Sequence, residues 1–349
     1  MTATETGTRE VGPDGISPAD MGRVEQPADP ELTVEGLSVC FTLPDARVAA
    51  VRDVWLQVRP GECLALVGES GCGKSVLASA LLGFLPANTE VAGRALLTGP
   101  DGPTLDLLTA PDRVLARTVR GRRIGLVPQS PAAHLTPVHT ARAQLEETVR
   151  ALHPDERAVR ARAEAIAARA GLHPRQLDLY PHELSGGMAQ RVATALALVG
   201  DAWLLIADEP TTGLDRPLVE ALSDELRGLV DTGRAVLLIT HDLAAARRVA
   251  DRIAVMYAGR LVEVGPSDAV LGAARHPYTH GLVQSLPDRD FVPIPGLPPL
   301  LTDLPPGCAF APRCPRVVPQ CKVQPPLADD PVEQVYHAVA CYRPLSGGS

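Results

Sequence analysis

The sequence has no hydrophobic run long enough to cross a bilayer. A membrane-spanning helix needs roughly twenty consecutive apolar residues, and no apolar run in these 349 residues approaches that length. No secretory signal opens the chain either, since residues 1–30 are polar, contain Pro and Gly, and are expected to be disordered. Hydrophobic residues still make up 45% of the sequence, enough for a sizeable core. We expect a soluble chain whose association with a membrane, if any, comes through a partner.

Aromatic residues and an excess of basic charge are also missing. Phe, Trp and Tyr account for only 3% of the chain, and Arg far outnumbers Lys, a bias that indicates a GC-rich genome more than a mechanism. The net charge of −8 argues against a general nucleic-acid surface. The cluster Arg117–Arg123 could contact a polyanion, but a solvated face or a salt-bridged edge is the favoured interpretation.

A phosphate-binding loop is the first motif that the sequence does contain. The apolar run Cys63–Val67 predicts a buried strand, and a helix is expected to start near Ser75, which is the context that the pattern G-x-x-x-x-G-K-S requires. Backbone N–H groups of such a loop form an anion nest at a helix N-terminus, Lys74 reaches the β- and γ-phosphates, and Ser75 ligates Mg²⁺. The loop predicted to bind nucleotide consists of Gly68, Glu69, Ser70, Gly71, Cys72, Gly73, Lys74 and Ser75.

Two acidic residues follow a second apolar strand, Trp203–Ala207. Asp208 is placed to hold Mg²⁺, directly or through water, and Glu209 is then free to polarise the attacking water. A carboxylate at this point could instead cap the next helix. We disfavour capping because the helix is expected to start only near Pro217.

Together with these two motifs, four further ones make the chain resemble the nucleotide-binding subunits of ATP-binding-cassette (ABC) transporters. Gln129 follows a predicted strand and matches the family's Q-loop, Leu184–Met188 resembles the signature sequence, Leu214-Asp215 matches the D-loop, and His241 matches the switch histidine. The resemblance covers about residues 31 to 270. It implies that two ATP-binding halves close on each other around the nucleotide.

The resemblance also implies a role for each matched residue. Ser185, Gly186 and Gly187 would cap the γ-phosphate held by the other subunit, at the start of a helix. Asp215 would lie at the nucleotide, His241 would contact the γ-phosphate or the water, and Gln129 would contact Mg²⁺ and the moving helical subdomain. Taken singly, His241 could be a satisfied loop histidine and Gln129 a surface amide. Phe41 is the candidate for stacking on adenine, and an ordinary core or edge aromatic is an equal alternative.

These motifs predict an α/β fold, a P-loop NTPase (RecA-like) core with an antiparallel β subdomain. We expect a disordered tail over residues 1–30, a nucleotide-binding domain over 31–270 and an inserted helical subdomain over about 130–191. Residues 271–349 are expected to form a small irregular extension that contains cysteines. The runs His276–Thr279 and Pro306–Pro315 make this extension resemble that of dipeptide and oligopeptide importer ATPases.

Four cysteines lie in the extension, with the spacing C-x5-C-x6-C-x19-C: Cys308, Cys314, Cys321 and Cys341. Clustered thiols in a cytosolic chain indicate a metal more than disulfides. The close C-x2-4-C pairs of structural zinc sites are absent. A [4Fe–4S] cluster, which some members of the resembled group carry, is the preferred prediction, with zinc and unligated thiols as alternatives. Cys72, inside the phosphate loop, is either a tolerated small residue or a thiol whose oxidation blocks ATP binding.

The resemblance implies an ATPase that uses ATP and Mg²⁺ to power import of dipeptides or oligopeptides. Its partners would be a second ABC ATPase subunit, identical or different, two transmembrane permease subunits and an extracytoplasmic peptide-binding protein, at the cytoplasmic face of the membrane. The same ATPase could serve nickel, metal chelates or antibiotic-like peptides. A soluble cassette acting on DNA or ribosomes usually has two cassettes or a long coiled coil, and neither is present here.

Overall fold

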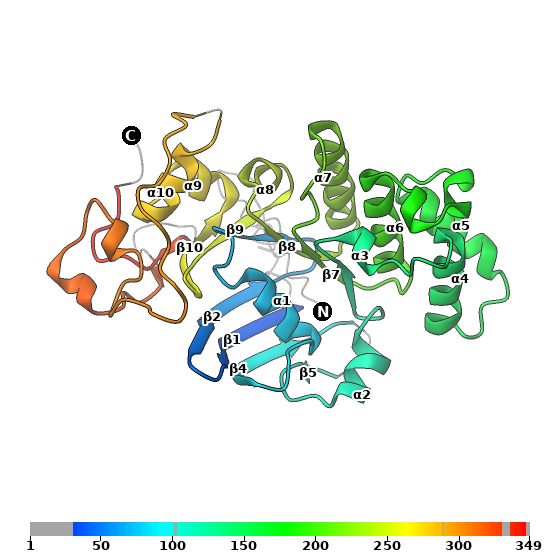
Figure 1. Ribbon diagram of the computed structural model, residues 1–349, viewed down its shortest axis with the longest axis horizontal. Helices are drawn as coiled ribbons and strands as arrows, with labels where there is room; N and C mark the ends of the chain where they lie inside the picture. Colours follow the sequence, from blue (N-terminus) through cyan, green and yellow to red (C-terminus); the bar gives the residue numbers. More distant parts are fainter. Residues whose placement is uncertain (1–30, 101–102, 288, 330–335, 347–349) are drawn as a thin grey trace, which may run out of the picture.

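Two β-sheets occupy the centre of the molecule (Figure 1). The computed structural model describes residues 31–100, 103–287, 289–329 and 336–346, and the tail predicted over residues 1–30 lies outside them. The smaller sheet is antiparallel, with the order β2-β1-β4-β5. Its strands are β1 (Leu32–Thr42), β2 (Arg47–Val58), β4 (Thr89–Leu97) and β5 (Leu105–Asp106). This is the antiparallel subdomain that the sequence predicts.

The larger sheet has eight strands in the order β11-β12-β10-β9-β3-β8-β7-β6. Neighbouring strands from β9 to β6 run parallel, and the pairs at the other end are antiparallel. The strands are β3 (Cys63–Val67), β6 (Ile124–Val127), β7 (Leu204–Asp208), β8 (Ala235–Thr240), β9 (Arg252–Tyr257), β10 (Arg260–Pro266), β11 (Ala328–Asp329) and β12 (Ala338–Val339). A parallel centre is typical of the predicted P-loop NTPase core, whose α/β class is confirmed.

Helices cover the sheets and extend beyond them. They are α1 (Lys74–Leu82), α2 (Asp112–Val114), α3 (Pro131–His134), α4 (Ala141–Leu152), α5 (Val159–Arg169), α6 (Gly186–Leu198), α7 (Arg216–Asp231), α8 (Leu243–Val249), α9 (Ser267–Gly272) and α10 (Pro277–Gln284). Short turns of 3-10 or π helix span Leu115–Val119, Pro174–Asp178, Pro181–Glu183, Ala311–Arg313 and Pro319–Lys322. Among the described residues, no helix is long and apolar enough to span a membrane.

The core lies on both faces of the large sheet. Because successive side chains of a strand point to opposite faces, β3 contributes Cys63, Ala65 and Val67 to one apolar cluster and Leu64 and Leu66 to another. All five are fully buried. A continuous apolar run is what a parallel strand covered on both faces needs, and it fixes the end of β3, where the phosphate loop begins.

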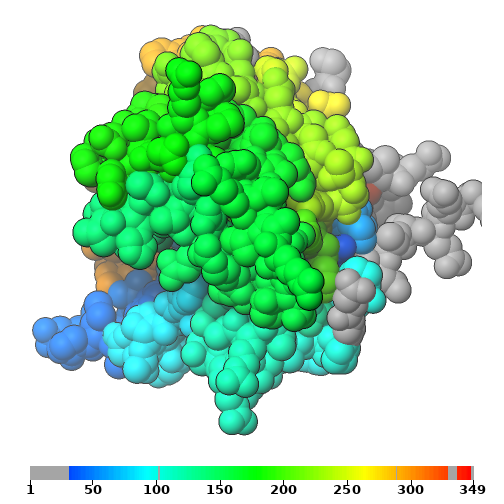
Figure 2. Space-filling model, turned by 90° about the vertical axis from the view of Figure 1, so that its right-hand side faces the viewer, coloured from blue at the N-terminus to red at the C-terminus, as the bar shows by residue number. Residues whose placement is uncertain are grey.

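The helices between β6 and β7 project to one side of the sheets, which Figure 1 shows in green. We call residues 131–198 the helical region; α6 continues seven residues past the expected boundary at residue 191, to Leu198. Figure 2 views the molecule from this end, where the helical region fills the middle of the face. The amphipathic helix α4 buries Leu145 and Val149 and exposes its other side.

We call residues 271–349 the C-terminal extension. Its described residues lie on the opposite side of the core (Figure 1). The extension adds β12 to the large sheet, pairing with β10 at Glu263 and Val264. The buried carboxylate of Glu263 accepts hydrogen bonds from the backbone N–H groups of Arg275 and His276, at 2.8 and 2.9 Å, and is 2.8 Å from Nε2 of His337. One buried acid therefore joins three parts of the chain.

Candidate functional site

The phosphate loop connects β3 to α1, as predicted, and close packing fixes its glycines. Gly73 has φ +109°, and a Cβ there would lie 2.0 Å from the carbonyl oxygen of Ala50. A Cβ on Gly68 would lie 2.2 Å from the carbonyl oxygen of Met256. The loop thus packs against β2 and β9 more closely than any side chain allows. At Gly71 nothing lies within 4 Å of a Cβ position, so this side of the loop is open.

Lys74, Glu209 and His241 come together beside the loop. Lys74 is 4% exposed, and its Nζ donates to the carbonyl oxygens of Gly68 and Glu69 at 2.8 and 3.2 Å. The same Nζ is 3.6 Å from Oε1 of Glu209, a residue that is 5% exposed. The other carboxylate oxygen of Glu209 is 2.5 Å from Nδ1 of His241. The structure therefore places a buried carboxylate between a cation and an exposed imidazole.

The backbone at Glu209 is held in an uncommon conformation. Its φ is +48°, in the left-handed region that few residues other than glycine adopt. Its N–H donates to the carbonyl oxygen of Ile239 in β8 at 2.8 Å, and its carbonyl oxygen accepts from Thr212 at 3.1 Å. Such strain persists where the surrounding structure imposes it, and it often accompanies function.

Ser75 and Asp208 form the predicted metal-binding pair. Oγ of Ser75 donates to Oδ1 of Asp208 at 3.0 Å, although the two residues are 133 positions apart in sequence. Burial raises the pKa of Asp208, and the hydrogen bond from Ser75 opposes that rise. Hard oxygen donors at the end of a phosphate loop suit Mg²⁺, which usually binds one or two carboxylates together with substrate phosphates. The residues present therefore fit Mg²⁺ and a nucleoside triphosphate.

The signature and D-loop residues lie at helix starts. Ser185 is the N-cap of α6, where its side chain accepts from the N–H of Met188 at 3.3 Å, and Gly186 follows as the first helical residue. Asp215 caps α7 in the same way, accepting from Leu218. Ser185, Gly186 and Asp215 are exposed, whereas Gly187 is buried. These recorded contacts are with their own helices, so the single chain does not join them to the Lys74 group.

Three other predicted site residues, Gln129, Phe41 and Cys72, differ in how far they are exposed. Gln129 is exposed just after β6. Phe41 is partly buried in β1 and packs against the apolar cluster that also contains Cys72, as a core aromatic does. Cys72 is 6% exposed, and burial raises the pKa of its thiol. A buried, protonated thiol favours the interpretation of Cys72 as a tolerated small residue.

Two residues that reach the phosphate loop were given no role from the sequence. Oη of Tyr278 in α10 accepts the backbone N–H of Glu69 at 2.9 Å. The guanidinium of Arg313 contacts both carboxylate oxygens of Glu69, at 2.9 and 3.1 Å. Both residues lie inside the two runs that carry the resemblance to importer ATPases, which is the signal that could have singled them out.

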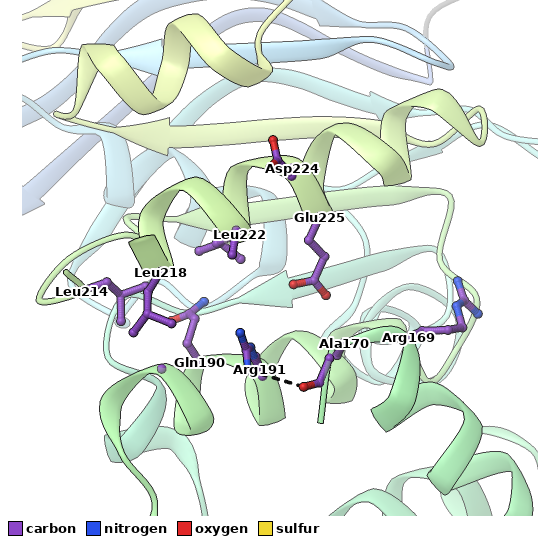
Figure 3. A pocket seen from close by; sticks show the side chains of 12 residues that line it. Arg169, Ala170, Gln190, Arg191, Leu214, Leu218, Leu222, Asp224 and Glu225 are labelled. Atoms are coloured by element: carbon purple, nitrogen blue, oxygen red, sulfur yellow. Dashed lines mark hydrogen bonds between the residues drawn. The ribbon is translucent and has the colours of Figure 1, made fainter. Parts of the chain in front are cut away.

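A cavity of about 410 Å³ separates the helical region from α7 (Figure 3). Glu225 of α7 points into it toward Arg191 of α6, which donates to the carbonyl oxygen of Gly171 at 3.4 Å. Oε1 of Glu225 and Nε2 of Gln190 are buried without hydrogen-bond partners. Burial raises the pKa of Glu225 to about 7. Polar groups left unpaired on two facing elements indicate an interface that is not fully closed.

Comparison with known proteins places the chain in a family. Residues 51–212 match the ABC transporter family model, and residues 262–321 match the model of the oligopeptide/dipeptide transporter C-terminal region. The oligopeptide transport ATP-binding protein OppD of Escherichia coli is 38% identical over 95% of this chain and 98% of its own length. A putative peptide import ATP-binding protein of Brucella ovis is 40% identical over 90% of this chain and 97% of its own length.

The chain belongs to the ATP-binding proteins of ABC transporters.

Two more similarities set the limits of this assignment. The OppD protein of Mycobacterium tuberculosis is 43% identical over 90% of this chain, but the chain spans only 52% of that relative's length. Among solved structures, the dimeric post-hydrolysis state of the ATP-binding cassette MJ0796 bound to ADP and Pi is 26% identical, with a TM-score of 0.59. The match covers 68% of this chain and 98% of the MJ0796 chain.

The predicted [4Fe–4S] cluster of this ABC protein is wrong. The described residues include all four cysteines, and among them no group of three or more His, Cys, Asp or Glu side chains could hold a metal ion. Burial raises the pKa of Cys308 to about 11 and also raises the pKa values of Cys314 and Cys341, whereas a metal binds the thiolate. The zinc alternative fails on the same finding. Cys308 and Cys314 instead pack against the apolar core.

Proposed function

We propose that this protein is the ATP-binding and hydrolysing subunit that powers import of dipeptides or oligopeptides through an ABC transporter. The observation that carries the proposal is the Lys74–Glu209–His241 group beside the phosphate loop, in a chain whose C-terminal part matches the oligopeptide/dipeptide transporter region. The names of the E. coli and Brucella relatives support peptides as the cargo.

Each residue of the site would have a distinct task. The N–H groups of Gly71 to Ser75 and the cation of Lys74 would bind the phosphates of ATP, with Lys74 moving from the loop carbonyls to the β- and γ-phosphates. Ser75 and Asp208 would hold Mg²⁺, and Gln129 would contact it from the edge of the helical region. When bound, Mg²⁺ would neutralise the negative charge that develops in phosphoryl transfer.

Glu209 would orient and deprotonate the attacking water, and His241 would hold Glu209 and contact the γ-phosphate. The 2.5 Å contact between Nδ1 of His241 and Glu209 fixes the carboxylate near the end of β7. A base must reach the proton that it removes, and general-base catalysis typically contributes a factor of about 10² to 10⁴. The positive φ of Glu209 is consistent with a backbone held for this purpose.

The remaining assembly belongs to the same proposal. Ser185, Gly186 and Gly187 would cap the γ-phosphate held by a second ABC ATPase subunit, with Asp215 beside it, and Phe41 would stack on adenine. The exposure of Ser185, Gly186 and Asp215 in the single chain supports a role across a subunit interface, as does the dimeric cassette among the similar structures. Two permease subunits and an extracytoplasmic peptide-binding protein would complete the importer, with this subunit at the cytoplasmic face of the membrane.

Substitution of Glu209 by Gln tests the proposal. The variant should bind MgATP like the wild type, because Gln keeps the size and the hydrogen-bonding capacity, but ATP turnover should fall by about a hundredfold or more. It should also trap a closed dimer with ATP. The measurements are nucleotide affinity, ATPase rate and oligomeric state with ATP, with Glu220→Gln on the exposed face of α7 as the control. Near-normal turnover in Glu209→Gln would remove the residue from the catalytic role.

A further inference from the structure

The phosphate loop is held from outside the nucleotide-binding core, by the C-terminal extension. Glu69, the second residue of the loop, meets the extension at two points. Its N–H donates to Oη of Tyr278, and its carboxylate receives both terminal nitrogens of Arg313. Arg313 and Glu69 are 244 residues apart in sequence. A paired, two-point contact of this kind fixes orientation as well as position.

Arg313 is itself rigidly held. A guanidinium has five N–H donors, and each has an acceptor here: two oxygens of Glu69, Oη of Tyr257, and the carbonyl oxygens of Ile294 and Pro295. The side chain of Arg313 is only 5% exposed. Its charged group lies 5.8 Å from the ring centres of both Tyr257 and Phe310. The extension therefore holds the Arg313 guanidinium in the orientation that contacts Glu69, which a chance surface contact would not do.

Glu69 passes this restraint to the residue that would bind phosphate. Its carbonyl oxygen accepts a hydrogen bond from Nζ of Lys74 at 3.2 Å. All three polar parts of Glu69 are thus engaged: the N–H with Tyr278, the carboxylate with Arg313 and the carbonyl with Lys74. The carboxylate also needs neutralising, because a free negative charge next to an anion nest would repel a triphosphate.

We propose that Arg313 is a positioning residue for the phosphate loop, so that the C-terminal extension is a working part of the ATP site. Arg313 turns the Glu69 carboxylate away from the phosphates, neutralises it and, through the Glu69 backbone, holds the loop in the shape that receives ATP. This inference rests on the proposed function of the loop as an ATP site. It assigns to Arg313 no contact with the nucleotide.

The test measures MgATP affinity of the full-length chain, by displacement of a fluorescent ATP analogue, beside its thermal unfolding temperature. Arg313→Ala should weaken MgATP binding by about tenfold or more, because the loop is displaced and Glu69 is left uncompensated. The MgATP affinity of Arg313→Lys should lie between those of the wild type and Arg313→Ala, since an ammonium cannot donate two parallel hydrogen bonds to one carboxylate. The matched control is Arg248→Ala at the surface of α8. Arg248 also contacts both oxygens of a carboxylate, that of Asp224, at 2.7 and 2.8 Å, through its Nε and one terminal nitrogen.

A double substitution separates positioning from plain destabilisation. If Arg313 acts through Glu69, adding Glu69→Gln to Arg313→Ala removes the uncompensated charge, and affinity should return to that of Glu69→Gln alone. A merely structural role would leave the double variant as weak as Arg313→Ala. If Arg313→Ala does not fold, Arg313→Lys with and without Glu69→Gln supplies the same comparison.

Two failures remain distinguishable. If Lys74→Ala binds MgATP as tightly as the wild type, the loop is not the ATP site and the proposed function fails. If binding depends on Lys74 but Arg313→Ala, Arg313→Lys and the wild type bind MgATP equally, the ATP site stands and the positioning role of Arg313 is overturned.

Discussion

The helical region faces α7 across a cavity, whereas the C-terminal extension meets the core through a buried strand pair and a fully paired guanidinium. At the first interface, Glu225 and Gln190 have buried polar atoms without partners. At the second, Glu263 and Arg313 each bind three or more groups. Unpaired polar groups at a contact make it easy to rearrange, and satisfied networks make it rigid. The C-terminal extension also has buried atoms without partners, such as Oγ1 of Thr279, so the comparison concerns these two contacts: the one at α7 is loosely paired, and the one at Glu263 and Arg313 is tightly paired.

The largest expected effect is on ATP hydrolysis, and it distinguishes the helical region from the C-terminal extension. Ser185→Arg, at the start of α6, should abolish ATP hydrolysis in the assembled complex, by a factor of about 10² or more, because it blocks the site that would cap the partner's phosphate. ATP binding by the isolated chain should be unchanged, in contrast to Arg313→Ala. The measurement pairs ATPase rate of the complex with nucleotide affinity of the chain. Full ATPase activity of an isolated monomer, independent of protein concentration, would contradict action across subunits.

Removing the anchor of the extension should have the next largest effect. Glu263→Ala leaves two backbone N–H groups and His337 without their buried acceptor, which should cost about 4 kcal/mol of unfolding free energy. Urea denaturation measures the loss. The control is Glu220→Ala, whose partner Arg216 is exposed and whose loss should cost roughly 0–1 kcal/mol. Equal stability of the two variants would mean that the extension is not held at Glu263.

Acid should loosen the extension through His276. Burial lowers the pKa of this histidine to about 4, from an ordinary value of 6.5. The unfolded chain therefore binds the proton more readily, and the stability that the neutral ring contributes above pH 6.5 is lost as the pH falls toward 4, up to about 3 kcal/mol. His276→Asn, which can still cap α10, should reduce this acid-dependent loss. Parallel pH dependence of the two proteins between pH 7.5 and 4.5 would exclude His276 as the source.

The smallest expected effect concerns Glu225 at the cavity, where stability changes with pH in the opposite direction from that at His276. Burial raises the pKa of Glu225 to about 7, above its unfolded value, so the folded protein binds the proton more readily. Stability should fall as the pH rises from 4.5 to 7, because a charged carboxylate then remains beside the cavity. Glu225→Gln should gain about 1 kcal/mol at pH 8 and nothing at pH 4. Thermal unfolding at the two pH values measures this, and a loss of stability at pH 8 would show that the attraction of Arg191 for the Glu225 carboxylate outweighs the cost of its burial.

Much of the core could be predicted because its signals are local. The apolar runs Cys63–Val67 and Trp203–Ala207 predicted β3 and β7 within about a residue, and Pro217 predicted the start of α7 within about a residue. The motif spacing predicted the loop, and the structure brings Lys74, Ser75, Asp208, Glu209 and His241 together there. The carboxyl ends of parallel strands meet at one edge of a sheet, so residues that follow such strands converge.

The extension could not be predicted in the same way. Its contacts with the core join positions far apart, such as Glu69 and Arg313, and no periodicity reports them. The four cysteines show the limit most clearly, because their number and spacing do not report burial or protonation. Burial keeps the thiol of Cys308 protonated, with a pKa of about 11, which the spacing cannot reveal.

The pairing of β12 with β10 has a consequence for synthesis. A ribosome makes the phosphate loop and the whole parallel sheet before it makes Arg313 and the strand Ala338–Val339. Until those residues emerge, the edge of β10 has no neighbour on one side and Glu69 has no counter-charge. Open strand edges template wrong pairing, so the nascent chain passes through a stage exposed to aggregation. A ribosome that stalls before residue 313 would therefore carry a chain in which the phosphate loop is already synthesised but lacks its contact with Arg313.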